Sequence, residues 1–427
     1  MNEIKKQQDL KGEKKLRILS LFSGCGGMDL GFEGGFIAPY KSVQNNPEWI
    51  EKRIDENWVI LKKTSFEIVF ANDILEEATL TWLNFMKDFG YNSSIYHTES
   101  IVDLTKKHEE GIFEFPHNID IVVGGFPCQD FSVAGKRKGF NSSKSHDGSI
   151  ADKDIPSEET RGKLYYWMKK VIDITKPKIF IAENVKGLVN LGHVKEIIQA
   201  DFSNANNDGY IVLTPQVLHA GNYGVPESRE RVFFIGIRKD CLKEGMEMKI
   251  LESSFENPTF YPYPKPTHNC TINQEGLADK VILRDIFKDL KEPDCSSDPS
   301  QIYYSKAKYM GSHCQGQKEI SLDKIGPTIR SEHHGNIEFR RLSHEHGGLN
   351  KEELEQGLKE RRLTPRECAL IQTFPPNYDF VIPIKANSKR FAVSSSKAYK
   401  VIGNAVPPIL AYNIAMQIQS LWNNYFK

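Results

Sequence analysis

The strongest constraint on the fold is a series of short apolar runs spread over the first 240 positions. They span residues 17–22 (RILSLF), 67–71 (EIVFA), 119–123 (IDIVV), 178–182 (KIFIA) and 231–237 (RVFFIGI). Stretches with helical periodicity, notably 164–175 and 194–200, separate several of these runs. Apolar strands that alternate with helices predict an α/β domain built on a doubly wound, mostly parallel sheet of the Rossmann-like kind.

Composition divides the chain into four segments. Residues 1–15 are polar and rich in lysine, which indicates a flexible tail ahead of a first domain at 16–240. After that domain the alternation gives way to a segment rich in proline and tyrosine (TFYPYPKPTH) and then to scattered short elements. We therefore expect a smaller, irregular domain over 241–375. Residues 376–427 contain a Gly-Asn break followed by an apolar helix.

Charge and hydropathy exclude some classes of protein without naming a partner. The 56 basic and 56 acidic side chains cancel, but residues 361–427 carry nine basic against two acidic side chains. A polyanionic partner is therefore permitted. The N-terminus has no apolar signal region, and no eighteen apolar residues run together. The sequence predicts neither export nor a membrane span.

Cysteine and histidine spacing predicts no metal site. The seven cysteines are odd in number and lack any C-x-x-C spacing, which argues against a disulfide framework or a zinc ribbon and favours a reducing cytosol. Six of the twelve histidines fall in the irregular region, but none has the spacing of a zinc finger. We expect these histidines to form hydrogen bonds at the surface.

Candidate site residues follow the apolar runs, because ligands of doubly wound sheets bind beyond the carboxyl ends of the strands. The first run ends in the glycine turn 22–27 (FSGCGG), whose backbone N–H groups can approach a ligand closely. The turn lacks the G-x-G-x-x-G spacing of NAD sites, and an ordinary strand-to-helix turn explains it equally well. Asp73 and Asp103 have the chemistry to hold a ribose or an adenine amine, or are solvated acids.

Cys128 follows the third run within GGFPCQ and occupies the place where a nucleophile belongs. The flanking glycines and glutamine are unlike a buried apolar environment, and the nearby Lys136, Arg137 and Lys138 favour a thiolate if the loop folds back. The alternative is a small buried hydrophobic residue, which is the usual role of a single cysteine.

Glu183 lies directly after the fourth run, where a carboxylate is costly unless it is paired. Arg229 and Arg231 are the predicted partners, since alternation along a strand puts them on the same side. This group forms either part of a reactive site or a purely structural ion pair.

Taken together, these residues resemble the DNA (cytosine-5) methyltransferases of bacterial restriction-modification systems. The motifs occur in the order of that family: FSGCGGMDLGF, GGFPCQDFSVAGKRKG, AENVKGL, NYGVPESRERVFFIGIR, RRLTPRECALIQTFP and YKVIGNAVPP. The resemblance covers about 16–240 and 361–420, and it identifies the intervening segment as the variable target-recognition region. It implies the S-adenosylmethionine-dependent methyltransferase fold, with the terminal helix packed against the first motif.

The resemblance also implies roles for individual residues. Cys128 would be the nucleophile, Glu183 the acid that contacts the base, and Arg229 and Arg231 would lie near the base and its loop. The implied S-adenosylmethionine pocket comprises Phe22, Ser23, Gly24, Gly26, Gly27, Asp73, Ile74, Asp103, Leu104, Pro127, Leu164 and Asn404. Implied DNA contacts come from Gln129, Ser132, Lys136, Arg137, Lys138 and Arg366.

The implied activity is methylation of C5 in a cytosine that is flipped out of duplex DNA, without a metal ion. The resemblance further implies a cytoplasmic monomer with a cognate restriction endonuclease. Residues 37–66 and 141–160 are expected insertions. A tRNA cytosine-5 methyltransferase and a catalytically silent DNA-binding regulator remain alternatives. The long recognition region disfavours the first, and the presence of both Cys128 and Glu183 disfavours the second.

Overall fold

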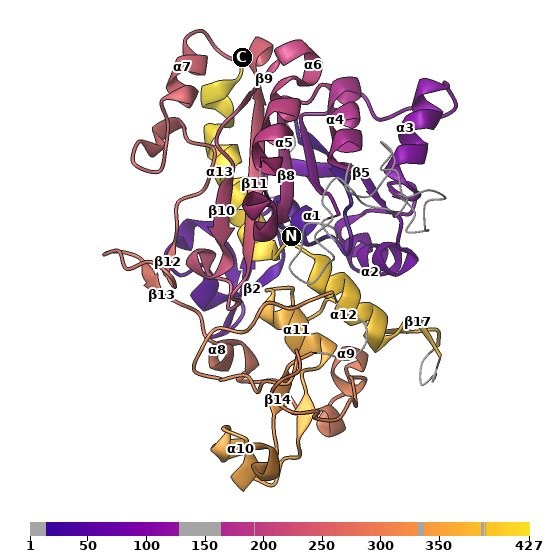
Figure 1. The fold of residues 1–427 in the computed structure, drawn as a ribbon, viewed down its shortest axis with the longest axis vertical. Coiled ribbons are helices and arrows are strands. Elements are labelled where there is room, and N and C mark those ends of the chain that lie inside the picture. The colour runs from indigo at the N-terminus through magenta and orange to yellow at the C-terminus, as the bar shows by residue number, and fades with distance from the viewer. Residues whose placement is uncertain (1–13, 128–163, 192, 332–336, 386–387, 389) are drawn as a thin grey trace, which may run out of the picture.

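The central sheet runs through the upper lobe of the protein (Figure 1). The computed structural model describes residues 14–127, 164–191, 193–331, 337–385, 388 and 390–427. The strand order is β10-β11-β8-β7-β1-β5-β6, and β9 also pairs with β11. The strands are β1 (Leu16–Leu21), β5 (Phe66–Asp73), β6 (Tyr96–Thr98), β7 (Ile121–Gly125), β8 (Ile179–Val185), β9 (Tyr210–Val212), β10 (Gln216–His219) and β11 (Glu230–Arg238).

All five apolar runs form strands of this sheet, which confirms the predicted α/β fold with a mostly parallel sheet. Strands β6, β5, β1, β7 and β8 are parallel to one another. The fifth run differs in direction, because β11 is antiparallel to β8, β9 and β10. An apolar run predicts a buried strand but not its direction, since both orientations bury the same side chains.

Helices cover both faces of the sheet, and alternate strand residues enter two separate cores. Ile18 and Ile121 face the core beneath α1 (Gly27–Glu33), α2 (Glu76–Met86) and α13 (Pro408–Tyr425). Leu19 and Val122 face the opposite core, beneath α3 (Ile101–Glu109), α4 (Leu164–Thr175) and α5 (Val194–Ser203). This burial on both faces explains why the strands are continuously apolar. The short α6 (Ala205–Asp208) follows α5.

The last helix of the chain packs against the first. A Cβ on Gly31 of α1 would lie 2.4 Å from the Cβ of Ala411 and 2.7 Å from the carbonyl oxygen of Pro408, so only glycine permits this approach. The stretch Ser395–Tyr425, which comprises α12 (Ser395–Asn404) and α13, is apolar and long enough to cross a membrane by length and composition. Most of it is buried inside the protein as core helices.

The expected insertion at 37–66 carries a small antiparallel sheet of its own. Its strands are β2 (Ile37–Pro39), β3 (Ile50–Arg53) and β4 (Trp58–Leu61), in the order β2-β4-β3. Strand β4 alternates between partly and fully buried residues, so Val59 and Leu61 join the main core. The insertion is therefore a packed element of the first domain.

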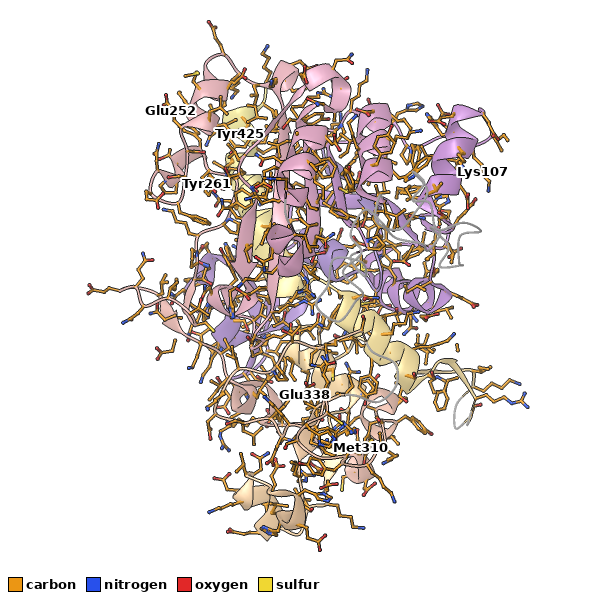
Figure 2. The ribbon with its side chains drawn as sticks, in the orientation of Figure 1. Lys107, Glu252, Tyr261, Met310, Glu338 and Tyr425 are labelled. Carbon is orange, nitrogen blue, oxygen red and sulfur yellow. The ribbon has the colours of Figure 1, made fainter. Side chains whose placement is uncertain are left out.

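The lower lobe contains short, scattered elements, as the composition indicates (Figure 1). They are α8 (Leu283–Phe287), α9 (Pro299–Ile302), β14 (Phe339–Arg341), α10 (Lys351–Glu355), β15 (Arg361–Arg362), α11 (Pro365–Ile371), β16 (Ile382–Pro383) and β17 (Phe391–Val393). Met310 and Glu338 lie in this lobe (Figure 2). Between the lobes, β12 (His268–Asn269) pairs with β13 (Ala278–Asp279).

Residues 242–263, assigned to the irregular domain from composition, pack on the upper lobe instead. They include α7 (Met246–Leu251), and Lys243 donates its backbone N–H to the carbonyl of Tyr425 at 2.8 Å. Tyr261 and Tyr425 lie in the same part of the upper lobe (Figure 2). The hydroxyl of Tyr263 donates to the carbonyl of Phe233 in β11 at 2.9 Å. Burial of apolar side chains attaches residues 242–263 to the upper lobe. Composition alone does not show which apolar side chains are buried.

Candidate active site

A cavity of about 860 Å³ opens at the carboxyl ends of β1, β5, β7 and β8. This is the size range of sites that enclose small molecules. Its lining combines the glycine turn, the ends of the strands, the end of α12 and part of the irregular region. Of the sequence-predicted residues, it includes Phe22, Ser23, Gly24, Gly27, Asp73, Ile74, Pro127, Leu164, Glu183, Arg231 and Asn404.

The turn after β1 is held in a strained conformation by the neighbouring strand. Phe22 has a φ of 53°, in the left-handed region that non-glycine residues rarely adopt. Ser23 donates its backbone N–H to the carbonyl of Asn72 at 2.7 Å, and its hydroxyl accepts the N–H of Asn72 at 3.1 Å. These paired bonds fix the turn against β5.

Asp73 lies at the end of β5 with its carboxylate fixed by backbone donors. One oxygen accepts the N–H of Gly24 at 3.0 Å, and the other accepts the N–H of Leu75 at 2.9 Å. Burial raises the pKa of Asp73, while these N–H groups oppose the rise. Each carboxylate oxygen retains a lone pair, so the group can still accept ligand hydroxyls.

Glu183 and Arg231 form a buried ion pair on the cavity wall. Nε of Arg231 lies 2.9 Å from Oε1 of Glu183, and the two side chains are 13% and 9% exposed. Burial raises the pKa of Glu183, and the positive charge of Arg231 opposes the rise. A Cβ on Gly125 would lie 2.7 Å from Oε2 of Glu183. The glycine of β7 therefore leaves the space that this carboxylate occupies.

Arg229 is fully buried and does not belong to the cavity lining. Its guanidinium donates to the carbonyls of Ile329 at 3.0 Å, Gly403 at 2.9 Å and Ala405 at 2.7 Å. Glu227 lies 3.5 Å away and compensates its charge. The resemblance implies that Arg229 lies near the base and its loop, whereas the structure places it behind the cavity lining, where it ties three distant segments of the chain together.

The cavity wall near α3 differs from the prediction. Asp103 and Leu104 lie within α3 and not on the lining, whereas Ser100 and Ile101 line the cavity. Strand β6 ends at Thr98, and the Ser100 hydroxyl caps α3 by accepting the N–H of Val102 at 3.2 Å. Asp103 therefore lies about one helical turn beyond Ser100, too far from the end of β6 to line the cavity. The sequence pattern S-x-x-D at 100–103 is typical of a helix N-terminus and could have indicated that α3 begins after Ser100.

Gly26 lies behind the cavity wall and is also absent from the lining. It caps α1 with a φ of 80°, and a Cβ there would lie 2.6 Å from the ring of Trp82. Its contribution is to the packing of the turn.

The proposed nucleophile and the loop that follows it lie outside the described residues. These are Cys128, Gln129, Ser132, Lys136, Arg137 and Lys138. The chain enters this segment from Pro127, which lines the cavity. The Asn184 amide donates to the carbonyl of Phe126 at 3.2 Å and so fixes the backbone just before Pro127.

The structure corrects the prediction that Arg366 contacts DNA. The Arg366 side chain is 3% exposed, its Nε donates to Asp298 at 2.6 Å, and its Nη1 donates to the carbonyl of Tyr378 at 2.8 Å. The neighbouring Arg361 is also buried, against Glu292 and Glu367. Part of the basic surplus after residue 361 therefore stabilises the lower lobe, and net charge alone does not distinguish such arginines from exposed ones.

The irregular region supplies one side of the cavity through residues that sequence reasoning missed. They are Gln315, Thr328, Ile329, Arg330 and Ser331. Gly403 makes this approach possible, since a Cβ there would lie 2.2 Å from the carbonyl carbon of Arg330. No motif marks these positions, because their place depends on tertiary contacts with α12. Among the described residues, no three His, Cys, Asp or Glu side chains form a metal-binding group.

Comparison with known proteins assigns the chain to a family. The sequence profile of the C-5 cytosine-specific DNA methylases matches residues 16–420. The chain is 31% identical to the Type II methyltransferase M.BsuRI of Bacillus subtilis, over all of this chain and 84% of that protein. It is 32% identical to M.BspRI of Lysinibacillus sphaericus, over 97% of this chain and 84% of that protein.

A solved structure supports the fold. The Entamoeba histolytica methyltransferase EhMeth superposes with a TM-score of 0.53 at 15% identity, covering 96% of this chain and 99% of that one. The chain therefore belongs to the C-5 cytosine-specific DNA methylases and is a DNA cytosine-5 methyltransferase.

Proposed function

We propose that this protein flips a target cytosine out of a specific duplex sequence and methylates its C5 through a transient bond between the Cys128 sulfur and C6. One observation carries the proposal. A single cavity unites the glycine turn, the Glu183–Arg231 pair and residues 328–331 of the irregular region. A cofactor, a base and the surface that reads its sequence context would meet there.

The residues present fit S-adenosylmethionine, which supplies an electrophilic methyl group when bound. Asp73 offers carboxylate lone pairs to sugar hydroxyls, and the polar Ser100 lines the wall nearby. Phe22, Ile74 and Leu164 provide apolar surface for an adenine ring. We assign Ser100 and Ile101 to this wall in place of Asp103 and Leu104.

The chemistry requires covalent activation, because C5 of cytosine is too weak a nucleophile by itself. The Cys128 thiolate adds to C6, while Glu183 delivers a proton to N3 and accepts a hydrogen bond from the exocyclic amine. C5 then behaves as an enamine carbon and takes the methyl group. A base removes the C5 proton, the C6–S bond breaks, the thiolate returns, and N3 gives its proton back to Glu183. The raised pKa of Glu183 suits a group that donates a proton to the base.

Access to the base requires flipping, which costs a few kcal/mol of lost pairing and stacking. The irregular region would read base edges, and phosphate contacts are proposed for Lys136, Arg137 and Lys138. The two Type II relatives support a role in protecting DNA from a cognate restriction endonuclease. We propose that the enzyme acts in the cytoplasm as a monomer on duplex DNA.

Trapping tests this proposal directly. Fluorine at C5 replaces the proton that must leave, so a duplex with 5-fluorocytosine and S-adenosylmethionine should give an adduct that survives denaturation and maps to Cys128. The Cys128→Ser variant should bind the duplex and form no adduct. An adduct on another cysteine, or the absence of an adduct with every duplex that the enzyme methylates, would overturn the mechanism. A duplex RNA of the same sequence tests the alternative substrate.

A further inference from the structure

The inserted sheet β2-β4-β3 is anchored firmly to the first domain. The hydroxyl of Tyr412, in α13, donates to the carbonyl of Lys62 at 3.1 Å. The ring of Trp49 meets the Tyr412 ring edge-on with centroids 5.4 Å apart. Val59 and Leu61 are completely buried. This side of the insertion therefore moves with the catalytic core.

The other side of the insertion holds the segment that leads into the irregular region. Nζ of Lys41 lies 2.7 Å from Oδ1 of Asp285, and the Asn57 amide donates to Oδ2 of Asp289 at 3.0 Å. Lys288 pairs with Glu56. These three contacts hold α8 and the residues just after it, more than two hundred positions away in sequence.

Two further contacts from the insertion lie close to β12. The ring of His268, which is completely buried, shares a hydrogen bond with the carbonyl of Lys41 at 2.8 Å. The Asn45 amide donates to the carbonyl of Thr267 at 3.1 Å. Figure 1 shows β2 between the upper sheet and the β12–α8 region. The insertion thus spans the junction of the two lobes.

A continuous series of bonds leads from α8 to the cavity. Leu283 donates its N–H to the carbonyl of Lys324 at 3.0 Å, and Arg284 donates to the carbonyl of Leu322 at 2.8 Å. Gly326 follows two residues after Lys324, and a Cβ on it would lie 3.2 Å from Cδ2 of Leu283. Gly326 donates its N–H to the carbonyl of Pro226 at 2.8 Å. Residues 328–331 then form the cavity wall. Whatever fixes α8 therefore also fixes this wall.

We propose that the insertion is a brace that sets the position of residues 322–331, and with them the DNA-binding side of the cavity. Lys41, Glu56 and Asn57 are positioning residues for the DNA substrate and contact neither the base nor the cofactor. The inference rests on the proposed function. It predicts different effects on the two substrates: loosening the brace raises KM for DNA and leaves KM for S-adenosylmethionine unchanged.

The test is steady-state kinetics of the triple variant Lys41→Ala, Glu56→Ala, Asn57→Ala. Surface contacts of this kind are individually weak, so losing all three should raise KM for DNA about three- to 150-fold. The kcat and the KM for S-adenosylmethionine should stay within twofold. The control is Glu109→Ala, Lys170→Ala, which removes an exposed pair of 3.1 Å between α3 and α4, away from the brace, and should leave KM for DNA unchanged.

A charge exchange distinguishes positioning from loss of folding. Lys288→Glu places two carboxylates together and should raise KM for DNA, and adding Glu56→Lys should restore it. An unchanged KM for DNA in a folded triple variant, equal effects on both KM values, or failure of the exchange to restore KM would overturn the brace. An inactive wild-type protein would instead overturn the proposed function.

Discussion

Nε of Arg231 lies 2.9 Å from Oε1 of Glu183, where the antiparallel pair β11 and β8 reaches the cavity. Burial and the arginine act on the carboxyl in opposite directions: burial raises its pKa, and the arginine lowers it. The net pKa stays above the ordinary value of 4.5. Both the stability and the reactivity of the site therefore depend on this pair.

We expect Arg231→Met to make stability more dependent on pH. A folded-state pKa above the unfolded value means that the native state binds the proton more tightly, so this stability is present at low pH. This contribution to the free energy of unfolding is lost as pH rises from about 4.5 through the raised pKa of Glu183. Without Arg231, the decrease in the free energy of unfolding between low and high pH grows by roughly 3–5 kcal/mol. Thermal melts at pH 5 and pH 8 measure it, and Glu183→Gln in the same background should abolish the difference.

Glu183→Gln should lower kcat by about 10² to 10⁴, the usual contribution of a positioned acid. The amide keeps the shape of the side chain but cannot deliver a proton to N3. Single-turnover methylation measures the rate, while equilibrium titration should show unchanged affinity for S-adenosylmethionine. A variant that methylates as fast as the wild type contradicts the assigned role.

Gly125→Ala should disturb Glu183 and little else. The new Cβ would lie 2.7 Å from Oε2 of Glu183, so the carboxylate must move away from the position it occupies beside Arg231. We expect a loss of kcat in a protein that still folds, measured by methylation assay and by melting temperature. In a Glu183→Ala background the clashing oxygen is missing, and Gly125→Ala should then have no further effect on stability.

Asp73→Asn should weaken binding of S-adenosylmethionine about 10- to 100-fold, since hydrogen bonds to charged groups contribute roughly 1.5–3 kcal/mol. Calorimetric titration of the cofactor measures the change. Asp103→Asn is the matched control, because Asp103 lies in α3 away from the cavity lining. Equal weakening by both variants would contradict the revised cofactor wall.

Arg366 and Lys186 should separate stability from DNA binding. Arg366→Ala leaves Asp298 without its buried partner and should destabilise the protein by about 3–5 kcal/mol.

Lys186 lines the cavity beside Glu230 and is 48% exposed. Lys186→Met should reduce the slope of log K against log salt by about 0.9 if it meets a phosphate. Thermal melts measure stability, and salt titrations of duplex affinity measure the slope. A slope that changes in the Arg366 variant, or a stability that changes in the Lys186 variant, would contradict the two assignments.

The strands were predictable because each is apolar along its whole length. The run at 178–182 gives β8, and Glu183 follows as the one carboxylate at the buried end of that strand. The positions of Ser100 and Arg366 were less predictable. The place of Ser100 depends on where α3 begins. The burial of Arg366 depends on Asp298, an acid from another part of the chain that pairs with it.

The side of the cavity formed by the irregular region was beyond prediction from sequence. Residues 328–331 reach it where Arg229 binds the carbonyl of Ile329 and Gly403 leaves room for Arg330. Each of these contacts joins segments that are far apart along the chain, and neither leaves a periodic pattern. The positions after the apolar runs and the resemblance to a family supplied the candidate catalytic residues, while the packing around them required the structure.

The contact between α1 and α13 has a consequence for biosynthesis. A ribosome makes Phe22 and Gly24 about 380 residues before Asn404 and Val406, which form the opposite wall. At 5–20 residues per second this takes roughly 20–80 s. Until Asn404 and Val406 have been made, the cavity lacks the wall that they form. Assembly of the cavity therefore waits for a segment that is distant in sequence from the glycine turn.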